Sequence, residues 1–159
     1  MLFGEVTAVE INEGRARELA ENLRRLGATN VQVVVADGRE LPAEHRDFDR
    51  ALVDAPCSGL GVLNRRPDLR WRAMPLPELQ LELLRSAAKR VRPGGTIVYS
   101  VCTITAEECE DVVDASGLTV DSTLAEDWPT FRHPRRPEFL QTLPHVHSTA
   151  GFFIARLRV

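Results

Sequence analysis

Five side chains in the sequence are of types that carry chemistry: the thiols of Cys57 and Cys102 and the carboxylates of Glu10, Asp37 and Asp54. A thiolate is a strong nucleophile that forms covalent intermediates. A carboxylate accepts hydrogen bonds from ribose hydroxyls or from an adenine amino group. The set is therefore suited to a covalent reaction beside a bound nucleoside.

Each of these residues lies at or just after the end of a predicted strand. Runs rich in Val, Ile and Ala predict strands at residues 6–11, 31–36, 48–53 and 96–101. The carboxyl ends of parallel strands form the edge where open α/β sheets bind ligands. We therefore expect Glu10 to hold a ribose and Asp37 an adenine, with Asp54 and the two thiols on the same edge.

Helices are predicted between these strands, which indicates an α/β fold with a mainly parallel sheet. Asn12 is placed to cap the first helix and Gly27 to end it. A second helix carries an apolar face from Leu79 to Val91 and should end at Pro93-Gly94-Gly95. The continuous apolar run at 31–36 predicts a strand that is buried on both faces.

The C-terminal third gives weaker signals. Thr105 and Glu108 have the spacing of a capping box for a short acidic helix that reaches Asp114. A short strand near 118–123, a proline-rich loop at 129–144 and a last strand at 151–159 complete the prediction. Cys109 lies inside the acidic helix, and we interpret it as a packing residue.

The composition limits the class of protein. The 159 residues suit one domain, with a net charge of −3 and a pI near 5.8. No apolar run approaches the roughly 20 residues of a membrane span, and no secretion signal is evident, so a cytoplasmic protein is expected. Three cysteines without CxxC spacing argue against a disulfide framework and against bound metal.

Positive charge is concentrated in two segments. Residues 64–72 (NRRPDLRWR) hold Arg65, Arg66, Arg70 and Arg72 against one aspartate, and residues 132–137 (RHPRRP) hold three more arginines. Each segment is either a solvated loop or a contact for nucleic acid phosphates. For Trp71 we favour a place in the core over base stacking.

The thiols are explained by pyrimidine chemistry. C5 of cytosine is a poor nucleophile, but addition of a thiolate at C6 makes the ring enamine-like, and C5 then accepts a methyl group from a sulfonium donor. A base later removes the C5 proton and the thiolate leaves. Cys102 lies between a strand end and a helix start, where the positive helix end stabilises a thiolate.

Four motifs, in this order, resemble the Nol1/Nop2/Sun family of RNA cytosine-5 methyltransferases, most closely its bacterial rRNA-modifying members. They are DAPCSGLGV at 54–62, NRRPDLRW at 64–71, YSVCT at 99–103 followed by Glu107 and Glu108, and PHVHSTAGFFIA at 144–155. The resemblance covers essentially the whole chain. It implies a Rossmann-like, S-adenosylmethionine-dependent methyltransferase fold with an antiparallel last strand.

The resemblance also implies roles for individual residues. Cys102 would attack C6, Cys57 would assist product release, and Asp54 would contact the target base or the cofactor. Glu10 and Asp37 would hold S-adenosylmethionine, and RNA, in particular rRNA, would be the substrate. DNA cytosine-5 methyltransferases use the cysteine of a Pro-Cys motif instead, so Cys57 stays open as the attacking thiol.

Two substitutions depart from the family pattern: Val101 stands where Thr is usual, and Ala150 where Asp is usual. A larger departure is that the family's glycine-rich loop and first strand do not occur in the sequence. We therefore expect residues 1–159 to be part of a catalytic domain, without the family's RNA-binding domain. Such a chain should have exposed or rearranged strand edges and bind the cofactor weakly.

The main alternative is a non-catalytic interaction module that acts beside another polypeptide. A nicotinamide dehydrogenase is disfavoured, because no G-x-G-x-x-G follows a predicted strand. An amino-directed methyltransferase would more often carry Asn-Pro-Pro-Tyr at 54–57. Neither enzyme class accounts for two thiols at the predicted edge.

Overall fold

A computed structural model describes residues 4–159, which divide into one compact unit up to His45 and a second, Arg46–Val159. The first unit consists of β1 (Val6–Glu10), α1 (Glu13–Leu26) and β2 (Val31–Val35). Its two strands are parallel and pair Glu10 with Val35. The predicted caps of α1 are confirmed, because the Asn12 side chain accepts from the Arg15 N–H and Gly27 has a φ of 67°.

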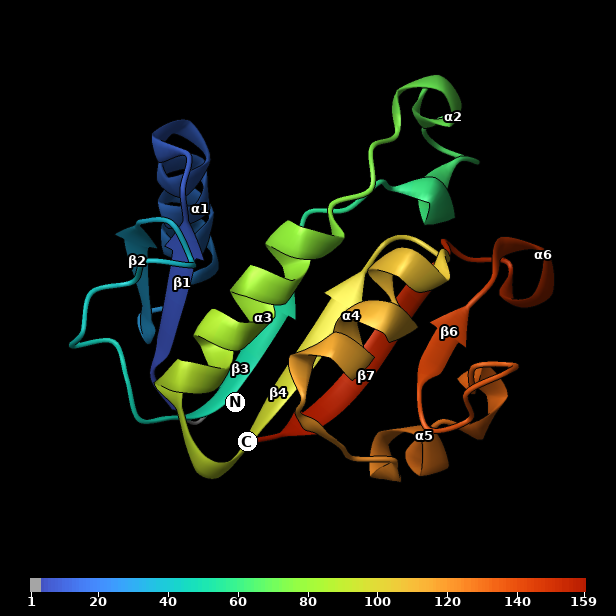
Figure 1. The fold of residues 1–159 in the computed structure, drawn as a ribbon. Coiled ribbons are helices and arrows are strands. Elements are labelled where there is room, and N and C mark those ends of the chain that lie inside the picture. Colours follow the sequence, from blue (N-terminus) through green and yellow to red (C-terminus); the bar gives the residue numbers. More distant parts are fainter. Residues whose placement is uncertain (1–3) are drawn as a thin grey trace. The chain divides into compact units, whose positions relative to one another are not determined.

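The second unit is built on a five-stranded mixed sheet (Figure 1). Its strands run in the order β3, β4, β7, β5, and β6 also pairs with β7. β3 and β4 are parallel, and β7 is antiparallel to β4, as predicted for the last strand. The bounds are β3 Phe48–Asp54, β4 Val91–Val101, β5 Thr119–Val120, β6 Leu140–Thr142 and β7 Phe152–Arg158.

Two helices, α3 (Pro77–Arg90) and α4 (Glu110–Ser116), cover one face of this sheet (Figure 1). Leu84 of α3, Tyr99 of β4 and Phe153 of β7 are fully buried in the resulting core. The remaining helical turns are η1 Leu60–Val62, α2 Leu69–Arg72, η2 Ala106–Glu108, α5 Thr123–Asp127, η3 Pro129–Phe131 and α6 Pro144–His147. Figure 1 shows that α2 lies in the connection between β3 and α3, which extends away from the sheet.

Two details of the predicted elements are wrong. β2 is not buried on both faces: Val35 is 53% exposed, because within residues 4–45 a single helix, α1, packs on this two-stranded sheet. Pro93-Gly94-Gly95 does not follow the end of α3 directly, because Val91 already pairs with Phe48 and starts β4. The tripeptide instead lies in an irregularity of that strand, where the pairing shifts between Phe48 and Arg50.

The sheet of each unit ends in an edge strand. Among residues 4–159, β1 is hydrogen-bonded only to β2, and β3 only to β4. Leu52 in the middle of β3 is 70% exposed, so its face of the sheet is open at that position. None of the helices formed by these residues is long and apolar enough to cross a membrane.

Candidate functional site

The ends of β3 and β4 bring two of the sequence motifs together. Parallel pairing sets Asp54, the last residue of β3, beside Ser100 of β4. The Ser100 hydroxyl donates to Asp54 Oδ1 at 3.0 Å, and the Ala55 N–H donates to the Ser100 carbonyl at 3.1 Å. The segment after Asp54 therefore leaves the sheet beside the segment after Ser100, and these segments carry the two thiols.

Cys57 and Cys102 are in direct contact, with 3.3 Å between their Sγ atoms. Both side chains are half-buried. Burial, followed by the hydrogen bond with Cys102, raises the pKa of Cys57 to about 12. Cys57 is therefore a neutral thiol near pH 7, and its S–H can donate to the sulfur of Cys102.

Two glycines fix the backbone beside Cys102. The Gly61 N–H donates to the Cys102 carbonyl at 3.0 Å, and the Gly151 N–H donates to the Gly61 carbonyl at 2.7 Å. A Cβ on Gly61 would lie 2.1 Å from the Gly151 oxygen, which no side chain can tolerate. Glycine is therefore required where the DAPCSGLGV segment passes between Cys102 and the start of β7.

Sequence reasoning missed two buried polar residues beside the thiols, Gln80 and Glu108. Both are fully buried, and the Glu108 carboxylate accepts from the Ser58 N–H at 2.9 Å. The capping-box prediction for Thr105 and Glu108 is wrong: Thr105 makes no side-chain cap, and the Glu108 carboxylate points into the protein instead. For Gln80 a signal existed, because it lies one turn from Leu84 on the buried face of α3.

Glu10 and Asp37 lie at or just after the carboxyl ends of β1 and β2, in the first unit. Glu10 Oε1 accepts from the Asn12 N–H and from Arg15, both at 2.8 Å. Hydrogen bonds from the Arg39 side chain and N–H lower the pKa of Asp37 to about 2. Both carboxylates are thus ionised acceptors.

The remaining thiol, Cys109, is fully buried, as predicted for a packing residue. Burial raises its pKa, and its S–H donates to the Thr103 carbonyl at 3.7 Å. The single helix predicted from Thr105 to Asp114 is divided in two. η2 ends at Glu108 and α4 begins at Glu110, so Cys109 lies between them. No group of three or more His, Cys, Asp or Glu side chains within residues 4–159 could hold a metal ion.

Comparison with known proteins agrees with these motifs. The family model described as 16S rRNA methyltransferase RsmB/F matches residues 2–158. The chain belongs to this family. Probable ribosomal RNA small subunit methyltransferase B of Bacillus subtilis is 37% identical over 98% of the chain, and ribosomal RNA small subunit methyltransferase B of Salmonella typhi is 39% identical over 96%. The chain covers 38% and 36% of these two relatives.

A solved structure gives the same result for the fold. NSun6 from Pyrococcus horikoshii, solved with SFG, is 35% identical and superposes with a TM-score of 0.82. The match covers 98% of this chain and 41% of that one. The Rossmann-like methyltransferase fold predicted from the sequence is thereby confirmed for this RsmB/F-family chain.

The first arginine-rich segment of the RsmB/F-family chain, residues 64–72, is a surface feature. Trp71 is 84% exposed, so its predicted place in the core is wrong. The reason is that α2 has only four residues and contains no buried side chain. The Arg70 guanidinium lies 5.7 Å from the Trp71 ring centre, and a shallow hollow of about 180 Å³ is lined by Leu63, Pro67 and Arg70.

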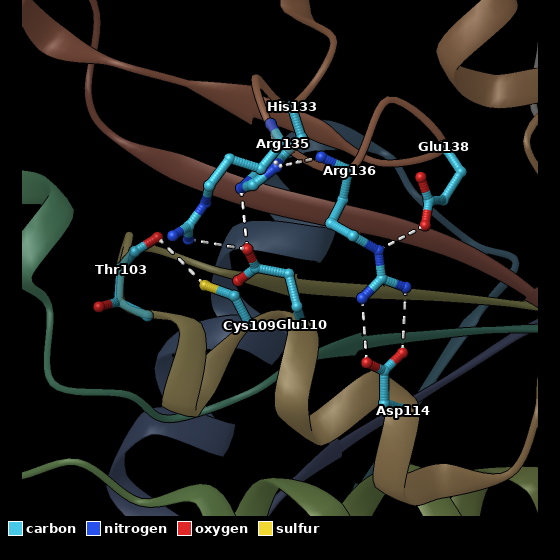
Figure 2. Close-up of polar contacts among 8 residues, drawn as sticks. All are labelled: Thr103, Cys109, Glu110, Asp114, His133, Arg135, Arg136 and Glu138. Carbon is cyan, nitrogen blue, oxygen red and sulfur yellow. Dashed lines mark hydrogen bonds and ion pairs between the residues drawn. The ribbon is translucent and has the colours of Figure 1, made fainter.

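The second arginine-rich segment, residues 132–137, folds back onto the acidic helix α4 (Figure 2). His133 Nδ1 accepts from two backbone N–H groups, so the proton is on Nε2, which donates to Glu110 at 3.1 Å. Arg136 makes two hydrogen bonds to Asp114 and one to Glu138. These contacts pair Arg135 and Arg136 with acids of the protein itself.

Proposed function

We propose that this chain carries the thiol site of an RNA cytosine-5 methyltransferase, with rRNA as the substrate. The observation that carries the proposal is the 3.3 Å contact between Cys57 and Cys102 at the ends of β3 and β4. A reaction that makes and then breaks a carbon–sulfur bond needs one thiol as nucleophile and gains from a second that can donate to the departing sulfur. The chain offers both groups in contact.

The family resemblance supports different roles for the two thiols. Burial raises the pKa of Cys57 to about 12, which suits a residue that keeps its proton near pH 7. Cys102 would be the nucleophile, as the resemblance implies: its thiolate adds to C6 of cytosine, and the electron pair of the C5–C6 double bond becomes available at C5. After C5 is methylated, a water molecule takes the C5 proton, the double bond re-forms and the C6–S bond breaks. The Cys57 S–H stabilises the departing thiolate.

S-adenosylmethionine would supply the methyl group from its sulfonium centre. The residues present fit such a ligand, because Glu10 and Asp37 are ionised at or just after the carboxyl ends of parallel strands. The hydrogen bonds from the Asn12 N–H and Arg15 both go to Glu10 Oε1, and a carboxylate has about four acceptor sites, so Glu10 keeps acceptor capacity for ribose hydroxyls. Asp37 already accepts hydrogen bonds from Arg39. Because a carboxylate has about four acceptor sites, it can also accept from an adenine amino group. Asp54 would contact the base or the cofactor.

RNA would be held by the 64–72 segment. Arg66 and Arg72 share Asp68 as an ion-pair partner, whereas Arg65 and Arg70 pair with no acid among the described residues. These arginines would contact phosphates, which fixes position without reading sequence. The exposed indole of Trp71 would stack on an unpaired base.

Trapping tests the proposal. A 16S rRNA transcript fragment containing 5-azacytidine should form a covalent adduct with the chain, detected as a band shift on a denaturing gel. Cys102→Ala should abolish the adduct, whereas Cys57→Ala should retain it. If Cys57→Ala abolishes the adduct and Cys102→Ala does not, the roles of the thiols are reversed. If no variant and no wild-type chain is trapped, a non-catalytic interaction module becomes the better interpretation.

A further inference from the structure

A buried hydrogen-bond network brackets Cys57 on both sides. The Gln80 side-chain amide donates to the carbonyl of Pro56 at 2.9 Å, immediately before Cys57. The N–H of Ser58, immediately after Cys57, donates to Glu108 Oε1 at 2.9 Å. Gln80 and Glu108 are themselves joined by a 2.9 Å hydrogen bond. One pair of side chains from α3 and η2 thus holds both peptides that flank the thiol.

The same pair is tied to the segment that carries Cys102. The Tyr99 hydroxyl donates to the Glu108 carbonyl at 2.7 Å and to Gln80 Oε1 at 3.2 Å. Ser58 Oγ and Thr103 Oγ1, on the residues that follow the two cysteines, are 3.0 Å apart. The network therefore connects the two thiol segments independently of the contact between the sulfur atoms.

Glu108 is unusual because its carboxylate is fully buried and forms no ion pair with a cation among residues 4–159. A buried charge is costly unless several donors satisfy it. Here the N–H groups of Ser58 and Leu76 and the amide of Gln80 all donate to Oε1. An amide in this position presents one acceptor oxygen where the carboxylate presents two, so it would hold the loop less firmly.

We propose that Gln80 and Glu108 are positioning residues that hold the S–H of Cys57 against the sulfur of Cys102. This inference rests on the proposed function. A hydrogen bond to the Cys102 sulfur stabilises the free thiolate but not the carbon–sulfur adduct. Loosening Cys57 therefore leaves addition possible and slows departure of the sulfur. Displacement of Cys57 has the same consequence as its removal: the enzyme remains covalently bound to RNA.

The first experiment measures position without RNA or cofactor. Diamide, an azo oxidant that is reduced to its hydrazine, converts two neighbouring thiols to a disulfide. Formation of the Cys57–Cys102 disulfide, followed by peptide mass spectrometry, should be at least about tenfold slower in Glu108→Gln and in Gln80→Met. Glu107→Gln is the matched control, because Glu107 is exposed and precedes Glu108 directly. Wild-type rates in both variants would overturn the proposal.

The second experiment measures the consequence with an unmodified 16S rRNA fragment and S-adenosylmethionine. Glu108→Gln and Gln80→Met should accumulate a covalent RNA adduct, as is also expected of Cys57→Ala, while turnover falls. A purely structural role would lower adduct formation and turnover together, and that result would contradict the proposal. If Glu108→Gln fails to fold, Gln80→Met still decides. Failure of the proposed function would instead appear as no Cys102-dependent adduct in any variant, with the disulfide rates still altered.

Discussion

The chain contains two arginine-rich segments of similar composition, and the fold uses them differently. In residues 132–137, Arg135 and Arg136 turn toward α4 and pair with Glu110 and Asp114 (Figure 2). In residues 64–72, Asp68 is the one acid available to four arginines. Residues 132–137 form a clamp that joins a loop to the helix α4. Residues 64–72 keep unpaired positive charge beside an exposed indole.

The difference between the segments comes from acids that are distant in sequence. Asp114 is 22 residues from Arg136, so no local pattern shows that the two form a bidentate pair. Residues 104–127 carry eight acids and no Lys or Arg, and part of this charge folds against residues 132–137. Local arginine content therefore does not identify an RNA contact. What matters is the charge left after the fold has paired its own acids.

The clamp should respond most strongly to the loss of His133. His133→Ala removes the donor to a buried carboxylate and leaves a cavity, and we expect a loss of roughly 3 kcal/mol in the free energy of unfolding. Urea denaturation measures this loss. His145→Ala is the control, because His145 is exposed and should change stability by less than about 0.5 kcal/mol. Equal effects of the two substitutions would show that the clamp does not hold the loop.

The 64–72 segment should show the opposite behaviour. Trp71→Ala removes an 84% exposed ring, so stability should stay within about 0.5 kcal/mol of wild type. Loss of one stacked base should weaken binding of single-stranded rRNA fragments roughly tenfold, as measured by fluorescence anisotropy. Trp128→Ala is the control, since Trp128 is also exposed (55%) but lies outside the segment. Unchanged affinity in Trp71→Ala would remove the indole from the proposed RNA contact.

Short-range patterns predicted much of the fold. The Asn12 cap and the strand end at Val101 are confirmed, and the third strand runs one residue past its predicted end, to Asp54. Each depends on residues that are close in sequence or on strand periodicity, which a single sequence contains. Trp71 was misplaced for a related reason: its amphipathic character suits core and surface equally, and only the tertiary fold decides.

The candidate site was predicted by residue type but not by geometry. Strand ends indicated that Cys57 and Cys102 share an edge, and the structure places their sulfur atoms in contact. The buried role of Glu108 was not predictable, because its partners Ser58 and Gln80 are 50 and 28 residues away. A glutamate three residues after a threonine has a capping interpretation from local spacing alone. Tertiary packing overrode that local preference.

Within the clamp, Arg136 should contribute less than His133. Its guanidinium makes a bidentate pair with Asp114 and lies 4.9 Å from the Phe139 ring centre, but a third of the side chain is exposed. Arg136→Ala should therefore cost about 1 kcal/mol in the free energy of unfolding. Arg66→Ala is the matched control, because the Arg66 pair with Asp68 lies within one surface segment and should contribute less than about 0.5 kcal/mol. Equal costs would mean that the two segments do not differ energetically.

The smallest expected difference is in pH dependence. Burial lowers the pKa of His133 below the usual 6.5, with Glu110 and Glu138 opposing the shift and Arg135 and Arg136 adding to it. Between the two pKa values the unfolded chain binds a proton that the folded chain does not, so stability is complete above about pH 6.5 and declines as the pH falls. The pKa of Asp114 is lowered by Arg136, so this carboxylate titrates below that window.

Urea unfolding between pH 5.5 and 8 should therefore show a decline in wild type that is weaker in His133→Gln, whatever the absolute stability of the variant. RNA affinity should not share this decline, because residues 64–72 contain arginines and one aspartate but no histidine, and their charge is constant over this range. A pH slope that is the same in His133→Gln and wild type would place the titrating group elsewhere. The stability of the clamp would then not differ from RNA binding by residues 64–72 in its dependence on pH.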